Sequence, residues 1–251
     1  MLSAHLAEPM TATFHDSMPE RYREAFDAPA IVEHAAIVQR RAAAPAHAEI
    51  WRRLPNGGAI VCVVADDRPG LLSLISASLV AQAMDVMGAQ VYTRALSEGP
   101  VAEAVDFLWL KRDADNALPI LDADVARIAE TLRSLITGEV ALETVIRGAR
   151  PMRPAPPGAS TRVTFDERPD AGLGVLTVET FDRPGLLLAI TQALFRARVQ
   201  IIASDATTKR GRVVDSFTVV ELDGAPIRHD RRGVVQMAVL SAIEAVARGE
   251  G

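Results

Sequence analysis

Apolar residues follow two periods along this chain, and the two periods predict alternating strands and helices. Residues 59–65 form a continuous apolar run, which is typical of a strand buried on both faces. The preceding Pro-Asn-Gly-Gly sequence predicts a hairpin turn between this strand and another at residues 49–54. Leu71, Leu72, Ile75 and Leu79 then recur at helical spacing, so a helix is expected over about residues 69–82. Strands at 85–94 and 104–111 follow, and then a helix that begins at Asp122 or Asp124, runs to Ile136 and ends at Gly138.

The same order of elements occurs a second time. The sequence Asp-Arg-Pro-Gly-Leu-Leu stands at residues 67–72 and again at 182–187, an offset of 115. After a hairpin turn that is six residues shorter, the offset becomes 109, and a final helix is predicted over about 230–248. A repeat of this length indicates a duplicated domain rather than a solenoid. Each unit reads strand, helix, strand, strand, helix, with an extra leading strand.

This pattern predicts an α+β protein with two ferredoxin-like (βαββαβ) domains in tandem, behind an N-terminal helical segment. The predicted divisions are an N-terminal segment at 1–46, a first domain at 47–147, a linker at 148–160 and a second domain at 161–251. Because residues 59–65 are apolar on both faces, we expect the sister domain to cover the second face of the sheet.

Outside the repeat, fewer features are informative. Residues 1–17 show little periodicity, and we expect them to be frayed. Asp27 is predicted to cap a helix over residues 28–43, with Pro29 just inside it. Residues 140–147 fit either a strand or a connector. The segment 148–158, rich in proline and flanked by arginines, predicts an extended linker.

Composition narrows the possible partners. A net charge of −5 and an aromatic content of 4% disfavour nucleic acid. The single cysteine, Cys62, lies within an apolar strand and is interpreted as a buried thiol. There is no signal peptide pattern and no apolar run long enough to cross a bilayer, so we expect a cytoplasmic protein without membrane partners. His34 is interpreted as a packing or surface residue, and neither a metal nor another cofactor is predicted.

The repeated turn is the strongest candidate for chemistry. Proline and glycine at a helix start leave backbone N–H groups that favour a carboxylate or phosphate. Asp67 and Asp85 could meet an ammonium group, so the pattern suits a free amino acid. The alternative is that Asp67 and Asp182 only cap their helices.

The turn and its flanking residues 64–72, together with the repeat at 182–187, resemble the ACT domain, a regulatory amino-acid-binding module. The runs at 89–93 and 104–107 resemble the C-terminal ACT pair of bacterial PII-protein uridylyltransferase/uridylyl-removing enzymes, and residues 21–22 and 31–37 resemble the helical segment before that pair. The resemblance implies a glutamine-sensing regulatory protein, with free glutamine as the first candidate ligand and a nitrogen-regulation protein as partner, and a homodimer is a further expectation. The implied ligand-binding residues are Asp67, Arg68, Pro69, Gly70, Leu71, Asp85, Val86, Gln90, Asp182, Arg183, Pro184, Gly185, Leu186, Gln200 and Ile201.

The two copies are not identical. Asp85 corresponds to Gln200, and Asp66 corresponds to Phe181, so the two sites are expected to differ in ligand, or one to be silent. No catalytic residues are predicted, because the nucleotidyltransferase and metal-hydrolase patterns are absent. Two rival hypotheses remain. One is an interaction module without a small ligand, whose N-terminal helices dock a uridylyltransferase or PII-like partner, and the other is an enzyme in its own right.

Overall fold

The computed structural model describes residues 11–96, 102–112, 118–149, 160–168, 173–209 and 211–248, and it shows an α+β fold, as predicted. The strands are β1 (Ala46–Arg53), β2 (Ala59–Asp66), β3 (Met84–Ala95), β4 (Ala102–Arg112), β5 (Arg162–Arg168), β6 (Leu173–Phe181), β7 (Val199–Lys209) and β8 (Arg212–Glu221). The helices are α2 (Glu20–Ala25), α3 (Ala28–Arg40), α4 (Leu71–Ala81), α5 (Asp122–Thr137), α6 (Leu142–Gly148), α7 (Leu186–Arg196) and α8 (His229–Ala247). A further helical segment occupies residues 11–17.

All eight strands belong to one antiparallel sheet, in the order β1-β2-β4-β3-β7-β8-β6-β5. The first repeat supplies one half of this sheet and the second repeat supplies the other half. The halves join where residues 88–91 of β3 pair with residues 204–207 of β7. Gln90 pairs with Asp205, which is its own counterpart at the offset of 115. The junction is therefore a local pseudo-twofold axis, like the isologous interface of a symmetric dimer within one chain.

Each half has the predicted order of elements, with its extra leading strand. The chain order is ββαββα, and the edge beside β2 or β6 is filled by the leading strand β1 or β5. In the ferredoxin-like order βαββαβ, a closing strand after the last helix would take this edge. An antiparallel neighbour can reach the edge by a short hairpin from the N-terminal side, as the predicted turn at 55–58 allows.

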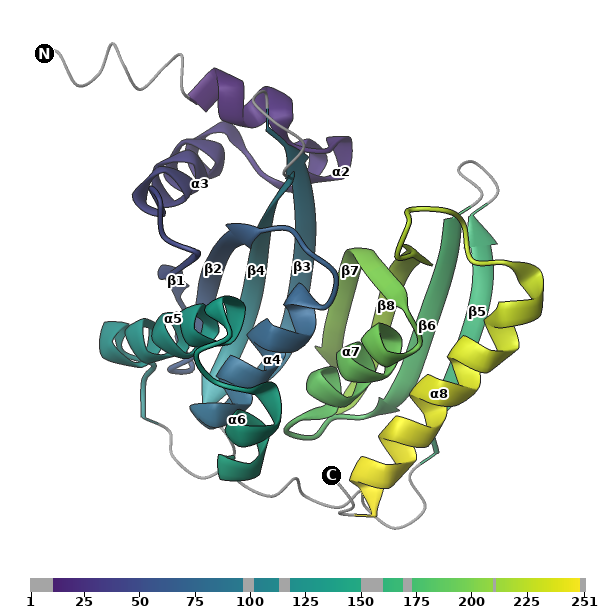
Figure 1. Ribbon diagram of the computed structural model, residues 1–251. Helices are drawn as coiled ribbons and strands as arrows, with labels where there is room; N and C mark the ends of the chain where they lie inside the picture. Colours follow the sequence, from purple (N-terminus) through teal and green to yellow (C-terminus); the bar gives the residue numbers. More distant parts are fainter. Residues whose placement is uncertain are drawn as a thin grey trace, which may run out of the picture.

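One face of the sheet is covered by helices α4, α5, α6, α7 and α8 (Figure 1). Each half has its own apolar core between sheet and helices, centred on residues such as Ile75 and Leu132 in the first half and Ile190 and Val239 in the second. Helices α4 and α7 pack against each other above the β3–β7 junction. The starts of these two helices, which carry the repeated turns, therefore lie next to the opposite repeat.

The other face of the first half is covered by the N-terminal cap, which we define as residues 11–40. Its helices lie at the top and upper left of Figure 1, apart from α4, α5 and α6, and bury Phe14, Met18 and Tyr22 against the strand residues Cys62 and Phe107. The expectation that the sister domain covers this face was wrong, because the two repeats join edge to edge rather than face to face. Cys62 is fully buried, as predicted, and burial raises the pKa of its thiol.

His34 lies in the interior of the cap, between α2 and the sheet. It is completely buried, its Nδ1 lies 2.7 Å from the hydroxyl of Tyr22, and its ring contacts those of Trp51 and Phe107. Burial lowers the pKa of His34 to about 4, because the charged imidazolium would lose its hydration. The packing interpretation of His34 is confirmed.

The corresponding face of the second half is polar. The counterparts of Cys62, Phe107 and Trp109 are Thr177, Ser216 and Thr218, at offsets of 115, 109 and 109. Among the described residues, no helix covers this face (Figure 1). The difference between the two repeats therefore follows from the side chains: the apolar face requires a cap, and the hydroxyl-rich face can be solvated.

Several local predictions need correction. Residues 11–17 are helical rather than frayed, because Phe14 packs on the sheet. The segment at 140–147, which fitted either a strand or a connector, contains most of helix α6, and this helix packs against α4. Asp27 caps α3 as predicted, accepting from the N–H of Ala30 at 3.0 Å. Most of the predicted linker, residues 150–159, lies outside the described residues.

Candidate functional site

The two repeated turns place the starts of α4 and α7. The N-caps are Gly70 and Gly185, with φ of 81° and 80°, and neither helix has a side-chain cap. A left-handed residue closes the turn, and the N–H of Leu71 donates to the carbonyl of Arg68. Asp67 and Asp182 lie before this turn, so the alternative that they cap their helices was wrong.

Gly70 is required at its position for two reasons. Its positive φ is costly for residues with a side chain, and a Cβ there would lie 2.9 Å from a ring carbon of Phe195. The N–H of Ser73 donates to the carbonyl of Gly70. Because the N–H groups of Leu71 and Ser73 both have backbone acceptors, the helix start is less open to an anion than the sequence suggested.

Each turn faces a strand start of the opposite repeat and forms a small pocket there. The Asp182 pocket lies between the start of α7 and the end of α4, and the residues lining it include Ser76, Met84, Asp85, Val86, Asp182, Arg183, Leu186, Leu188, Val213 and Asp215. The Asp67 pocket lies between the start of α4 and the end of α7, and the residues lining it include Asp67, Arg68, Gly70, Leu71, Ser73, Asp106, Thr191, Phe195, Gln200 and Ile201. The pseudo-twofold axis at the junction relates the two pockets.

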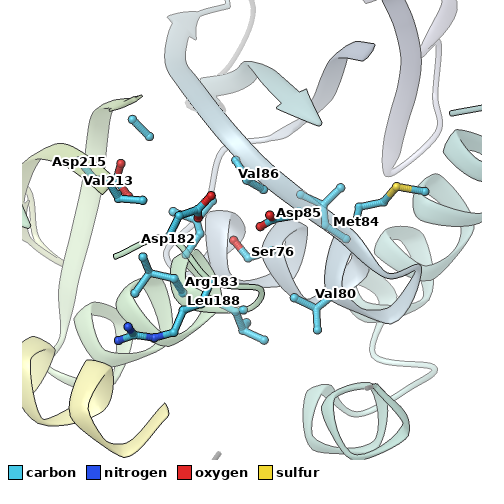
Figure 2. Close-up of a pocket in the computed structure, with 15 residues that line it drawn as sticks. Ser76, Val80, Met84, Asp85, Val86, Asp182, Arg183, Leu188, Val213 and Asp215 are labelled. Carbon is cyan, nitrogen blue, oxygen red and sulfur yellow. The ribbon is translucent and has the colours of Figure 1, made fainter. Parts of the chain in front are cut away.

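Carboxylates converge in the Asp182 pocket. Figure 2 shows the side chains of Asp85 and Asp182 turned toward the same space, with the hydroxyl of Ser76 beside them. Lys111, on β4, joins the two: its Nζ lies 3.0 Å from Asp85 and 3.6 Å from Asp182. Burial alone would lower the pKa of Lys111, but the hydrogen bond to Asp85 and the two negative charges raise it. The ammonium therefore links carboxylates that belong to different repeats.

A further carboxylate, Asp215 on β8, lies deeper in the same pocket. It is buried, and burial together with the negative charge of Asp182 raises its pKa to about 7. Burial also raises the pKa of Asp182, with the charge of Asp85 as a second cause. The guanidinium of Arg183 does not neutralise this group of acids, because it turns toward α8 (Figure 2) and donates to the carbonyl of Ile243 at 3.0 Å.

The Asp67 pocket has the same framework with different side chains. Asp67 accepts a hydrogen bond of 2.9 Å from the hydroxyl of Thr93, and burial raises its pKa. Asp106, the counterpart of Asp215, is fully buried, and burial and the nearby charge of Asp67 raise its pKa. The amide of Gln200 stands where Asp85 stands in the other pocket. The hydroxyl of Ser73 is buried in the pocket lining.

The structure brings most of the predicted site residues together, with three exceptions. The Asp182 turn meets Asp85 and Val86, and the Asp67 turn meets Gln200 and Ile201. Asp67 and Asp85 therefore lie in different pockets, contrary to the idea that they meet one ammonium group. Gln90 lines neither pocket, because its side chain lies on the cap side of the sheet. The turn prolines, Pro69 and Pro184, are not lining residues either.

Sequence reasoning missed Lys111, Ser73, Asp106 and Asp215. A signal was present for the two aspartates, since an acidic residue recurs at the centre of an apolar strand in both copies. A buried carboxylate in such a strand is costly unless it has a specific partner or function. Lys111 gave no such signal, because its partners come from the other repeat and from β3.

Both pockets are narrow in this structure. Each has a cavity volume of about 20 Å³, which is room for about one water molecule. Among the described residues, no cluster of three or more His, Cys, Asp or Glu side chains could hold a metal ion. A search of the same residues found no helix long and apolar enough to span a membrane.

Fold and pockets together define a class: an α+β protein with two related halves, one continuous sheet and two pockets across the junction between the halves. No family model matches the chain. It is similar to proteins named bifunctional uridylyltransferase/uridylyl-removing enzyme: 29% identical over 246 residues in Rhodospirillum rubrum, 28% over 239 in Phenylobacterium zucineum and 30% over 171 in Nitrobacter hamburgensis. These alignments cover 90%, 94% and 66% of this chain, but only 25%, 25% and 17% of the relatives. The resemblance to these enzymes is confirmed, and the chain spans about a quarter of their length.

Proposed function

We propose that this chain is a regulatory protein of the ACT type that senses a free amino acid, with glutamine as the first candidate. The observation that carries the proposal is the pair of pockets at the junction, each built from the turn of one repeat and a strand start of the other. Acidic side chains in both pockets suit an ammonium group, and Arg68 suits a carboxylate. These are the two charged groups of a free amino acid.

The location of the pockets supports regulation rather than storage of a ligand. A ligand can shift a conformational equilibrium only if it contacts the two states differently. A molecule held between the start of α4 and Gln200 contacts both repeats, so its binding energy depends on how the repeats are arranged. Since each cavity holds only about one water, we expect the α4–α7 contact to adjust when an amino acid enters.

The similarity to uridylyltransferase/uridylyl-removing enzymes supports a nitrogen-regulation setting in the cytoplasm. We infer that the matched quarter corresponds to their regulatory portion, with ACT domains at 47–147 and 161–251. In this proposal the chain responds to glutamine and changes how it meets a uridylyltransferase or PII-type partner. The proposal assigns no catalytic residues.

Thermal unfolding with each of the twenty amino acids tests ligand binding. A ligand that binds only the folded state raises the unfolding temperature, and the stabilisation grows with the logarithm of the ligand concentration once that concentration exceeds Kd. We expect glutamine at millimolar concentration to raise the midpoint, and D-glutamine to have a smaller effect. If no amino acid shifts the midpoint of a cooperatively folded sample, the sensing proposal is wrong.

The narrow cavities favour one alternative, an interaction module that binds no small molecule. In that case the junction would be a permanent packing contact, and a PII-type partner would bind regardless of glutamine. A pull-down of a PII-type protein with and without glutamine separates the two functions. Equal recovery in both conditions favours the interaction module, and glutamine-dependent recovery favours sensing.

A further inference from the structure

The two junction pockets have the same backbone framework but different charge. At corresponding positions, Asp85 in the Asp182 pocket becomes Gln200 in the Asp67 pocket, and Lys111 corresponds to Val220 at the offset of 109. A cation thus contacts two lining carboxylates of one pocket, and an apolar residue takes the matching position in the other repeat. The charged groups that still lack a partner indicate which pocket can bind a charged ligand.

In the Asp182 pocket, the place for an ammonium group is already taken. The Nζ of Lys111 lies 3.0 Å from Asp85 and 3.6 Å from Asp182, so one ammonium bridges the two repeats. Because this ammonium is tethered, it competes at a high effective concentration, on the order of millimolar or more. A free amino acid would have to displace it, and then leave the Lys111 charge without these partners.

The arginine of this pocket is also committed. Arg183 is buried, with 5% of its surface exposed; its Nη2 donates to the carbonyl of Ile243 on α8, and its Nε has no hydrogen-bond partner among the described residues. It cannot reach a ligand carboxylate without breaking its contacts with that helix. Its counterpart Arg68 is exposed and donates to the carbonyl of Ile136 at 3.1 Å, so it can turn to a new acceptor at little cost.

The Asp67 pocket has a buried hydroxyl that is not yet satisfied and a carboxylate without a cation. Ser73 is 2% exposed, and its Oγ has no hydrogen-bond partner within the described part of the chain. The carboxylate of Asp67 accepts from the neutral hydroxyl of Thr93, and no ion pair among the described residues includes it. A buried hydroxyl without a partner is uncommon and costly, and a ligand at this position could supply the missing partner.

We propose that the two pockets have separate roles: the Asp67 pocket binds one free amino acid per chain, and Lys111 acts as a built-in occupant that closes the Asp182 pocket and latches the repeats together. In this arrangement Asp67 receives the ligand ammonium, Arg68 its carboxylate, and Ser73 and Gln200 its side-chain amide. This assignment rests on the proposed function and specifies where, and how many times, the ligand binds.

Equilibrium dialysis with radiolabelled L-glutamine measures the stoichiometry directly. We expect one bound glutamine per chain. Asp67→Asn should weaken binding at least tenfold, whereas Asp182→Asn should change it less than threefold. Asp66→Asn is the matched control, because Asp66 is the neighbouring carboxylate but pairs with Arg41 outside the pocket.

Lys111→Met tests the latch itself. If this variant is folded by circular dichroism, we expect a second glutamine to bind, because the carboxylates of Asp85 and Asp182 then lack their cation. A folded variant that still binds one glutamine overturns the role given to Lys111. The Asp67 and Asp182 substitutions decide the location of the site even if the Lys111 variant does not fold.

The outcomes separate this inference from the proposed function. Two equivalent glutamines per wild-type chain, or loss of binding in Asp182→Asn but not in Asp67→Asn, would overturn the inference and leave amino-acid sensing intact. Absence of binding by any of the twenty amino acids to the folded wild-type chain would overturn both.

Discussion

Replacing Asp215 by asparagine should remove part of the pH dependence of the free energy of unfolding. Asp215 is buried in the Asp182 pocket, and its pKa in the folded protein is about 7. In the unfolded chain an aspartate titrates near about 3.9. Between these two values the folded state binds a proton that the unfolded state has lost, so wild-type stability falls as the pH rises from about 4 to about 7. Asparagine does not titrate and removes this contribution.

The two pKa values set the size of the effect. Their separation corresponds to roughly 4 kcal/mol, so we expect an effect of roughly 2 to 4 kcal/mol. This is the amount by which Asp215→Asn should gain on the wild type between pH 4 and pH 8. The comparison across pH cancels the constant cost of burying the amide hydrogens of asparagine.

Urea unfolding at several pH values, followed by circular dichroism, provides the measurement. The free-energy difference between Asp215→Asn and wild type should be flat below pH 4, rise toward pH 7 and level off above it. Asp166→Asn, which changes an exposed carboxylate on β5, is the control and should show little dependence. A difference that stays constant from pH 4 to pH 8 would refute the assignment of a raised pKa to Asp215.

Four further substitutions test the packing around the junction and the cap. Gly70→Ala should destabilise the protein by about 1 to 3 kcal/mol, because alanine disfavours the positive φ and its Cβ would clash with Phe195. Adding Phe195→Ala should relieve only the clash, and urea unfolding of the single and double variants measures both contributions. Tyr22→Phe removes a buried partner of His34 and should cost about 1 to 3 kcal/mol at pH 7. Since the pKa of His34 is lowered to about 4, cap stability should be present above about pH 6.5 and decline toward pH 4, which tryptophan fluorescence can follow. Gly88→Val should push β3 away from β7, because even a Cβ would lie 2.9 Å from the carbonyl of Ala206, and hydrogen exchange should rise in both strands; unchanged exchange would contradict the junction.

The duplication was the most informative property of the sequence. It predicted that each turn faces the strand of a neighbouring domain that begins at Asp85 or Gln200. The structure has this arrangement, with the Asp182 turn beside Asp85 and the Asp67 turn beside Gln200. The edge-to-edge junction itself could not be predicted. The apolar and polar pattern of β3 and β7 does not distinguish them from edge strands whose free edge faces solvent. The interrepeat contact of Lys111 depends on that junction and was therefore missed.

The sequence indicated that the second face of the first half is covered, but we attributed the cover to the sister domain instead of the N-terminal cap. Residues 59–65 are apolar on both faces, whereas β6 alternates between buried and half-buried residues. This difference indicates that only one repeat has a covered second face, which excludes a symmetric sister domain as the cover. Gln90 lies on the cap side of the sheet, in a separate cavity beside Arg21 and Tyr92, because alternation along β3 places its side chain opposite that of Val91.

Calorimetric titration of L-glutamine into the folded chain measures binding and stoichiometry in one experiment. We predict saturable heat with one glutamine per chain, lost in Asp67→Asn and retained in the neighbouring control Asp66→Asn. Heat that is absent for glutamine and for every other amino acid, from a sample that unfolds cooperatively, would contradict this prediction.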